Sequence, residues 1–362
     1  MIRHLYLALV AAGLLTGCST LGYYGHLAAG QWQLLAGRKP VAALIAAPAT
    51  NPGLREKLSL ARAARDFAAQ ELRLPDNGSY RSYVDLERPY AVWLVIATDE
   101  FSVKPRQWCY PLLGCFSYRG FFDERRARDH ADRLQEQGMD VHVSGAIAYS
   151  TLGWFDDPLL NTMLGRDETF LVGLLFHELA HQRLHIRDDT AFNEAFAVTV
   201  ARTGVQRWLE HLGREADFAR YRAHETREHA LHRLLVATRG RLAELYASGL
   251  PPARMRQEKQ RLFTALQSDY ARLRSGWDGE HGFDAWMAQD LNNAHLALVA
   301  TYHELEPGFA ALLEQNDGDL AAFYAAAEAL GKLPQNERHA QLQRLHSTSA
   351  ACAVLSTGKT AR

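Results

Sequence analysis

The segment from Phe170 to Ala197 places the tightest constraint on how this chain can fold. It reads FLVGLLFHELAHQRLHIRDDTAFNEAFA, and apolar side chains dominate both of its ends. The pattern predicts two buried helices, joined near Arg187–Thr190 by a turn whose short polar side chains can cap the second helix. Two histidines and two glutamates inside buried helices cost free energy unless these groups have partners. The segment therefore predicts a helical hairpin built around a polar site.

The polar residues of this segment have the spacing of a metal site. His177 and His181 are the ends of an H-E-x-x-H motif, and on a helix both imidazoles project from one face. Neutral imidazole suits Zn²⁺, and a catalytic zinc has three protein ligands and one position open to water. Glu194, in the first turn of the second helix, is the candidate third ligand. Glu178 is the candidate general base toward a water held by the metal. We expect one Zn²⁺ per chain.

Two other interpretations of this segment remain open. The histidines could be core residues with hydrogen-bond partners, and the site could be structural in a non-catalytic lipoprotein. His185 lies four residues after His181 and could compete as a ligand. We expect the first helix to end near Ile186, which leaves His185 outside the ligand set. The intact Glu178 favours catalysis, because a structural zinc usually has protein in its fourth position.

The N-terminus predicts export and lipidation. A basic start is followed by an apolar run, Leu5–Leu15, that is too short to span a bilayer. It ends in L-T-G-C, which resembles a bacterial lipobox with Cys18 as the lipidated residue; an ordinary signal peptide or an anchor helix is the alternative. We expect attachment to the membrane through this lipid, in the bacterial envelope and facing the periplasm. Ser19, in place of Asp, favours the outer membrane.

Charge and cysteine content limit the remaining classes. The chain has 40 Lys and Arg against 41 Asp and Glu, so bulk electrostatics give it no reason to bind nucleic acid. It is 48% hydrophobic, which excludes a disordered chain. Cys109 and Cys115 flank a turn, and in an oxidising periplasm they predict a disulfide, with zinc binding as the alternative. Cys352 is expected to be a free thiol.

The remaining sequence predicts an α+β fold that is predominantly helical. After a signal peptide at residues 1–17, we expect a small N-terminal α/β part with a mixed sheet at 18–157. A long helical part that carries the zinc site should follow at 158–362. Apolar runs predict strands at 90–98 and 140–151. Periodic apolar positions predict helices at 19–75, 122–138, 217–249, 252–276, 284–315 and 318–331.

The zinc motif followed by Asn193-Glu194-Ala195-Phe196-Ala197 resembles the gluzincin metallopeptidases. The second piece is similar to the N-E-G-F-A of zinc aminopeptidases related to aminopeptidase N. The whole chain resembles a bacterial family of lipoproteins described as putative aminopeptidases, through residues 108–120, 149–158 and the zinc motif. The resemblance implies a zincin-like active-site helix, a peptide substrate and cleavage at the amino end.

The chain departs from these families at several positions. Twelve residues separate His181 from Glu194, fewer than is usual for aminopeptidase N relatives. Ala148 stands where those enzymes carry the glutamate that holds the free amine of the substrate, and Val198 replaces an aspartate of thermolysin. Exopeptidase and endopeptidase activity therefore both stay open, and the oligomeric state is not indicated.

The resemblance also suggests substrate-binding residues. Gly145, Ala146 and Tyr149 lie on the strand before the zinc motif, which would pair with an extended peptide. An ordinary sheet strand is the alternative. By order in the chain, Tyr302 and His303 are candidates to stabilise the oxyanion, with Tyr149 as a third option.

Overall fold

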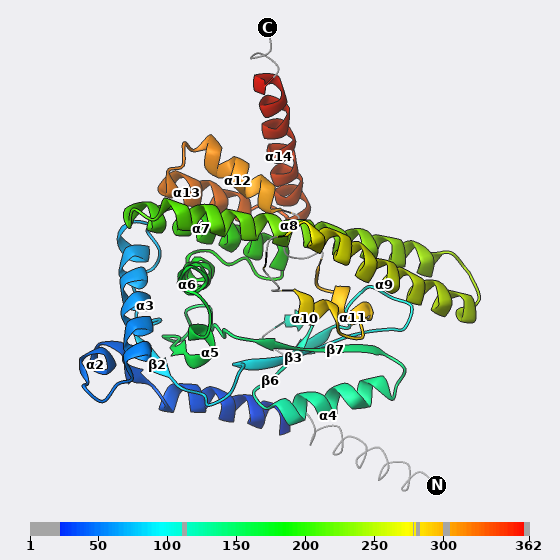
Figure 1. Cartoon of the computed structure of the whole chain (residues 1–362), viewed down its shortest axis with the longest axis horizontal. Helices are drawn as coiled ribbons and strands as arrows, with labels where there is room; N and C mark the ends of the chain where they lie inside the picture. Colours follow the sequence, from blue (N-terminus) through cyan, green and yellow to red (C-terminus); the bar gives the residue numbers. More distant parts are fainter. Residues whose placement is uncertain (1–21, 111–113, 278, 280–282, 300–304, 358–362) are drawn as a thin grey trace, which may run out of the picture.

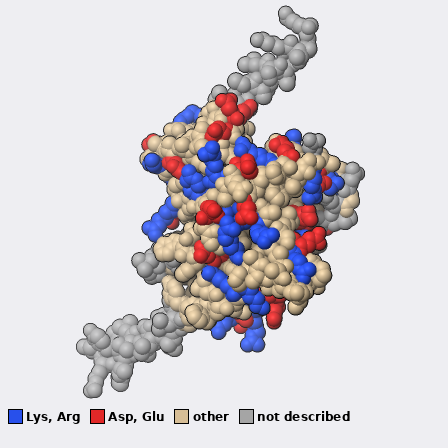
Figure 2. Space-filling model, turned by 90° about the vertical axis from the view of Figure 1, so that its left-hand side faces the viewer, with Lys and Arg blue, Asp and Glu red and all other residues tan. Residues whose placement is uncertain are grey.

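The computed structural model describes residues 22–110, 114–277, 279, 283–299 and 305–357, and the side chains among them except those of 215 and 348–357. Helices dominate this part of the chain, and its strands form small sheets at one side (Figure 1). The predicted α+β, predominantly helical fold is therefore confirmed. In the face that Figure 2 presents, Lys and Arg side chains are interspersed with Asp and Glu.

The main sheet has the strand order β6-β3-β7, with antiparallel neighbours throughout. Its strands are β3 (Val92–Thr98), β6 (Arg119–Phe121) and β7 (Asp140–Ala146). β3 is buried on both faces because helices cover both (Figure 1). Val95 and Ala97 pack on α4 (Glu124–Gln135), whereas Ile96 packs against α11 (Asn293–Leu296). The alternation follows from the two-residue period of a strand.

β7 is an outer strand of this sheet, and it is shorter than the sequence predicted. It ends at Ala146 rather than at Thr151. The next carbonyl, that of Ile147, accepts a hydrogen bond from Thr162 Oγ1 at 2.5 Å. The register with β3 stops at Ala146, and the residues that follow form a loop.

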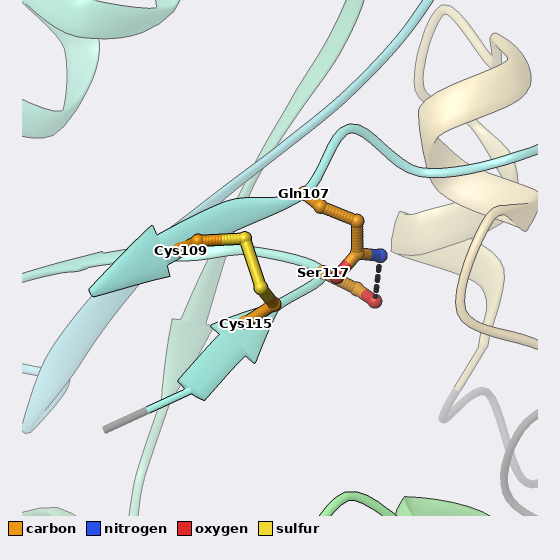
Figure 3. Close-up of a disulfide and its surroundings, with 4 residues drawn as sticks. All are labelled: Gln107, Cys109, Cys115 and Ser117. Carbon is orange, nitrogen blue, oxygen red and sulfur yellow. Dashed lines mark hydrogen bonds between the residues drawn. A yellow bond between two sulfur atoms is a disulfide. The ribbon is translucent and has the colours of Figure 1, made fainter. Parts of the chain in front are cut away.

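The other strands are short. β1 (Lys39–Pro40) pairs antiparallel with β2 (Ser82–Val84), which pairs parallel with β8 (Leu159–Leu160). β4 (Trp108–Tyr110) and β5 (Gly114–Phe116) form a hairpin. Figure 3 shows the Cys109–Cys115 disulfide across this hairpin, and Gln107 Nε2 donates to Ser117 Oγ at 2.8 Å beside it. The predicted disulfide is therefore confirmed.

The largest hydrophobic core lies among helices. Its main elements are α3 (Pro52–Gln70), α6 (Glu168–Arg183), α7 (Thr190–His211), α12 (Glu306–Gln315) and α13 (Leu320–Gly331). Gly204 of α7 permits the close approach of α7 to α6 and to Leu72. A methyl group at Gly204 would lie 2.6 Å from the Phe176 ring of α6 and 2.7 Å from the Leu72 side chain. The core includes side chains from both sides of residue 157, and the domain division at that residue stays a prediction.

Three further helices extend from this body. α8 (Glu215–Ala247) and α9 (Pro252–Ser275) form a long antiparallel pair, and α14 (Gln335–Thr357) leads to the C-terminus (Figure 1). α8 and α9 closely follow the helices predicted at 217–249 and 252–276. In the described residues, no helix combines the length and the apolar character that crossing a membrane requires.

The prediction of one helix over 284–315 is wrong. This stretch contains α10 (Asp284–Met287), α11 and α12 as separate pieces. Asn292 is the reason for one break, because its side chain caps α11 and also donates to the Val141 carbonyl of β7 at 3.0 Å. The run at 19–75 is also divided, into helical residues 22–36, α2 (Val41–Ala46) and α3, and Asn51 caps α3.

Candidate active site

The first helix of the predicted hairpin is α6. Asp167 caps its start by accepting a hydrogen bond from the Phe170 amide at 2.9 Å, and its apolar side chains fill the core. α6 ends at Arg183, three residues before the predicted end at Ile186. His185 therefore lies in the turn and does not continue the helical face of His181.

Side chains lock the turn that leads into α7. Asn193 accepts from the Ile186 amide and donates to the Ile186 carbonyl, both at 2.7 Å. Asp189 caps α7, and its buried carboxylate also accepts from Arg338 Nε at 2.6 Å and pairs with His339 at 2.9 Å. Since Glu194 follows Asn193 directly, these bonds fix where its side chain points.

The hairpin brings three candidate metal ligands together. His177 Nε2 lies 3.1 Å from His181 Nε2, and the Glu194 carboxylate lies 3.3 Å from the first and 3.6 Å from the second. Ligands about 2.0–2.1 Å from a tetrahedral Zn²⁺ are about 3.3–3.4 Å apart. The three groups therefore fit a zinc ion, and they form a cluster able to hold a metal.

The charges of these groups also suit a cation. Burial and the neighbouring His177 lower the pKa of His181 to about 3, so its imidazole is neutral near pH 7. Burial opposes the charge on Glu194, but the hydrogen bond and charge of His177, with His181, hold the pKa of that carboxyl below its usual value. Burial also opposes a charged His177, yet Glu194 and Glu178 raise its pKa. The carboxylate of Glu194 thus attracts positive charge toward the ligand cluster.

Glu178 lies next to the ligands in a different electrostatic setting. Burial raises its pKa to about 7, helped by the carboxylates of Glu194 and Asp157 and opposed by His177. A carboxylate with a pKa near neutrality can both take and release a proton at that pH. Glu178 therefore remains the candidate general base.

Two tyrosines near the site were not predicted from the sequence. Tyr80 is 2% exposed and has a left-handed backbone with φ of 63°. Its buried hydroxyl makes no hydrogen bond of normal geometry among the described groups. Burial raises the pKa of Tyr80, and so do the charges of Glu178 and Asp157. The turn N-G-S before Tyr80 is the only local signal in the sequence.

The second tyrosine, Tyr118, lies just after the disulfide hairpin of β4 and β5. A methyl group at Gly114 would lie 3.2 Å from Asp188 Oδ1, so the hairpin lies against the turn between α6 and α7. Tyr118 follows β5, and its pKa is raised by burial and by the charge of Glu194. The resemblance had singled out Tyr118 as part of a matching segment without a role.

The remaining predicted residues are spread more widely. Gly145 and Ala146 lie on the outer strand β7, and a side chain at Gly145 would collide with the Tyr90 ring. Tyr149 lies beyond the end of β7, with its ring centroid 5.3 Å from that of Phe122. Cys18, Tyr302 and His303 lie outside the described residues.

Residues 22–342 match a protein family described as "Putative aminopeptidase". The chain belongs to this family. The match spans the sheet, the disulfide hairpin and the helical hairpin with its metal-ligand cluster. No curated protein and no solved structure matches the chain.

Proposed function

We propose that this member of the putative aminopeptidase family is a zinc-dependent metallopeptidase of the gluzincin type. His177, His181 and Glu194 would hold the zinc. The observation that carries the proposal is the spacing of these three ligand atoms, 3.1–3.6 Å apart, with the partly buried Glu178 next to His177 on the same helix. Metal-assisted peptide hydrolysis uses a cation beside a base, and these residues would hold the cation and supply the base.

When bound, Zn²⁺ would polarise the scissile carbonyl and lower the pKa of the attacking water. Glu178 would take the proton of that water and pass it to the leaving amine. Its surroundings suit this cycle, because burial and the nearby carboxylates raise its pKa to about 7. Tyr118 lies within the electrostatic reach of Glu194 and joins Tyr302 and Tyr149 as a candidate hydrogen-bond donor to the oxyanion.

The outer edge of β7 would hold the peptide backbone. The Val141 carbonyl points away from β3, since it accepts from Asn292. In an antiparallel strand every second residue faces the same edge, so the backbone groups of Val143 and Gly145 do as well. An extended peptide could pair with them as an added strand.

The proposal that the enzyme cleaves at the amino end of its peptide substrate rests on the description of the family. Ala148 has no carboxylate for a free amine, and Asp157 already accepts hydrogen bonds from the Ser150 hydroxyl and from the Thr151 amide and hydroxyl. An endopeptidase with the same site is the second candidate. Lipidation at Cys18, the signal peptide and a periplasmic location at the outer membrane remain part of the proposal.

Purified mature protein should contain about one zinc per chain, and Glu178→Gln should keep this zinc while it lowers kcat by about 10²–10⁴-fold. Glu168→Gln, at the start of the same helix, is the matched control and should leave kcat unchanged. A Glu178→Gln variant with zinc and full activity would exclude Glu178 as the base. Bound zinc without any peptide hydrolysis by the wild type would favour a structural site.

A digest of a peptide library separates the two peptidase hypotheses. Mass spectrometry should find peptides that are shorter by single N-terminal residues. Internal cleavage positions would instead favour the endopeptidase.

A further inference from the structure

The loop after β7 exposes large apolar side chains. Trp154 is 84% exposed, Phe155 48% and Leu152 39%, and the three lie within four consecutive residues. Single exposed apolar residues are common, but a group of this kind usually marks a binding surface. The loop therefore needs an explanation that the fold itself does not give.

Hydrogen bonds hold this loop in a fixed shape. The Thr151 hydroxyl donates to Asp157 at 2.8 Å and accepts from the Phe155 amide at 3.0 Å. Leu152, a branched residue, has a left-handed φ of 55°, followed by Gly153 at 84°. Such strain persists only where the surroundings enforce it, and it is common at functional sites. The apolar side chains are thus presented by an ordered loop.

The same loop is attached to the active-site helix. Ser79 Oγ accepts from the Asp157 amide at 3.3 Å and from Gln182 Nε2 at 3.2 Å. Gly153 faces Gln182 as well, since a methyl group there would lie 3.8 Å from its side chain. Gln182 is the residue after the candidate ligand His181. The loop therefore lies against α6 one residue beyond the metal-ligand cluster.

We propose that the loop Leu152–Phe155 binds an apolar side chain of the peptide substrate and so selects large hydrophobic residues near the cleaved bond. The proposal rests on the proposed peptidase function and deepens it. An indole, a phenyl ring and an isobutyl group offer a broad apolar surface, which a Phe or Leu side chain of a substrate can cover.

The charges around the loop favour a peptide over a membrane surface. Residues 149–158 contain no Lys or Arg, and two aspartates, Asp156 and Asp157, follow the aromatic pair directly. Segments that bind anionic lipids use clusters of Lys and Arg, and the negative surface of such lipids repels carboxylates. A peptide with an apolar side chain has no such penalty.

The test compares two peptides that differ only in Phe against Ala at one position beside the cleaved bond. In the double variant Trp154→Ala/Phe155→Ala, the Phe-to-Ala ratio of kcat/KM should fall by about 10–100-fold, because the apolar contact is lost. Trp32→Ala removes another exposed tryptophan, 70% exposed on the helical residues 22–36, and should leave this ratio unchanged.

A ratio that is the same in wild type and double variant would overturn the proposal. If the double variant also binds phosphatidylglycerol vesicles more weakly than wild type while the ratio stays the same, the loop is a membrane contact instead. Peptides with a reduced amide bond, which cannot be cleaved, give a separate readout by calorimetry. If the wild type cleaves no peptide, the proposed function fails, and preferential binding of the Phe peptide that the double variant loses would still support the loop.

Discussion

The α6–α7 hairpin and the loop at residues 149–158 depart from the usual arrangement of protein side chains in opposite ways. The hairpin buries His181 and Asp189 and partly buries His177, Glu178 and Glu194, whereas the loop exposes a tryptophan, a phenylalanine and a leucine. Buried polar groups need partners; Asn193 finds them on Ile186 within the hairpin, and Asp189 finds them on Arg338 and His339 of α14. The loop instead uses its hydrogen bonds to hold apolar groups in water.

The difference indicates where stability and function should separate. In the hairpin, the bonds that fix the ligands also hold two core helices together, so changes there should affect both properties. In the loop, the apolar side chains contribute little to the core, so changes there should affect substrate binding alone. Three predictions test this division, and one more tests a histidine pair outside both regions.

The largest effect is expected from removing a ligand. His181→Ala should lower the zinc content from about one ion per chain to near zero and abolish hydrolysis, because two ligands hold zinc poorly. His185→Gln is the control, because His185 lies in the turn after α6. This variant should keep both the bound zinc and the hydrolysis of peptides. Metal analysis and peptide assays measure the outcome. A His185 variant that loses zinc would place this residue among the ligands.

A large loss of stability is expected at the cap of α7. Asp189→Asn leaves the 7% exposed Arg338 without its buried carboxylate and should lower the free energy of unfolding by about 3–5 kcal/mol. The neighbouring Asp188 is exposed, and Asp188→Asn should change the free energy of unfolding by less than about 0.5 kcal/mol. Urea denaturation measures both. Equal effects of the two substitutions would contradict the division.

Acid should lower the stability of the fold through a histidine pair that lies outside the metal-ligand cluster. The rings of His142 on β7 and His295 on α11 lie 3.9 Å apart, and burial lowers their pKa values to about 4 and about 3. The unfolded chain therefore binds more protons below pH 6.5, and stability should fall from that pH downward. His295→Gln can still accept the capping hydrogen bond from Asn292.

This variant should reduce the pH dependence by at most about 1.4 kcal/mol per pH unit between pH 6.5 and 4. Denaturation at a series of pH values gives the slope. His346→Gln, an exposed position, should leave it unchanged. If His295→Gln also leaves the slope unchanged, the pair does not titrate as its burial implies.

The smallest effect on stability is expected in the loop. Trp154→Ala should change the free energy of unfolding by less than about 0.5 kcal/mol, because the side chain is already in water. Phe196→Ala, in the core of the hairpin, should cost about 3–5 kcal/mol. Thermal and urea unfolding compare the two. A strongly destabilised Trp154 variant would show that the loop belongs to the core after all.

Local patterns in the sequence predicted much of this structure. The buried strand at 92–98 follows from a continuous apolar run, the helical hairpin from two apolar segments joined by turn residues, and the pair α8 and α9 from apolar periodicity, and all three signals depend on neighbours a few residues away. The same reasoning failed at 284–315, where Asn292 bonds to β7 about 150 residues earlier in the chain. A contact that distant leaves no periodic signal.

The sequence by itself determined the chemistry of the site: two histidines four residues apart on a helix, a glutamate between them, and a second glutamate on the next helix as the third candidate ligand. Only the tertiary structure decided what surrounds these groups. It brought Tyr80, Tyr118 and the loop of Trp154 to the hairpin from segments 20 to 100 residues away. The physical reason is that a helix fixes the directions of its own side chains, whereas burial and electric fields depend on every element packed around them.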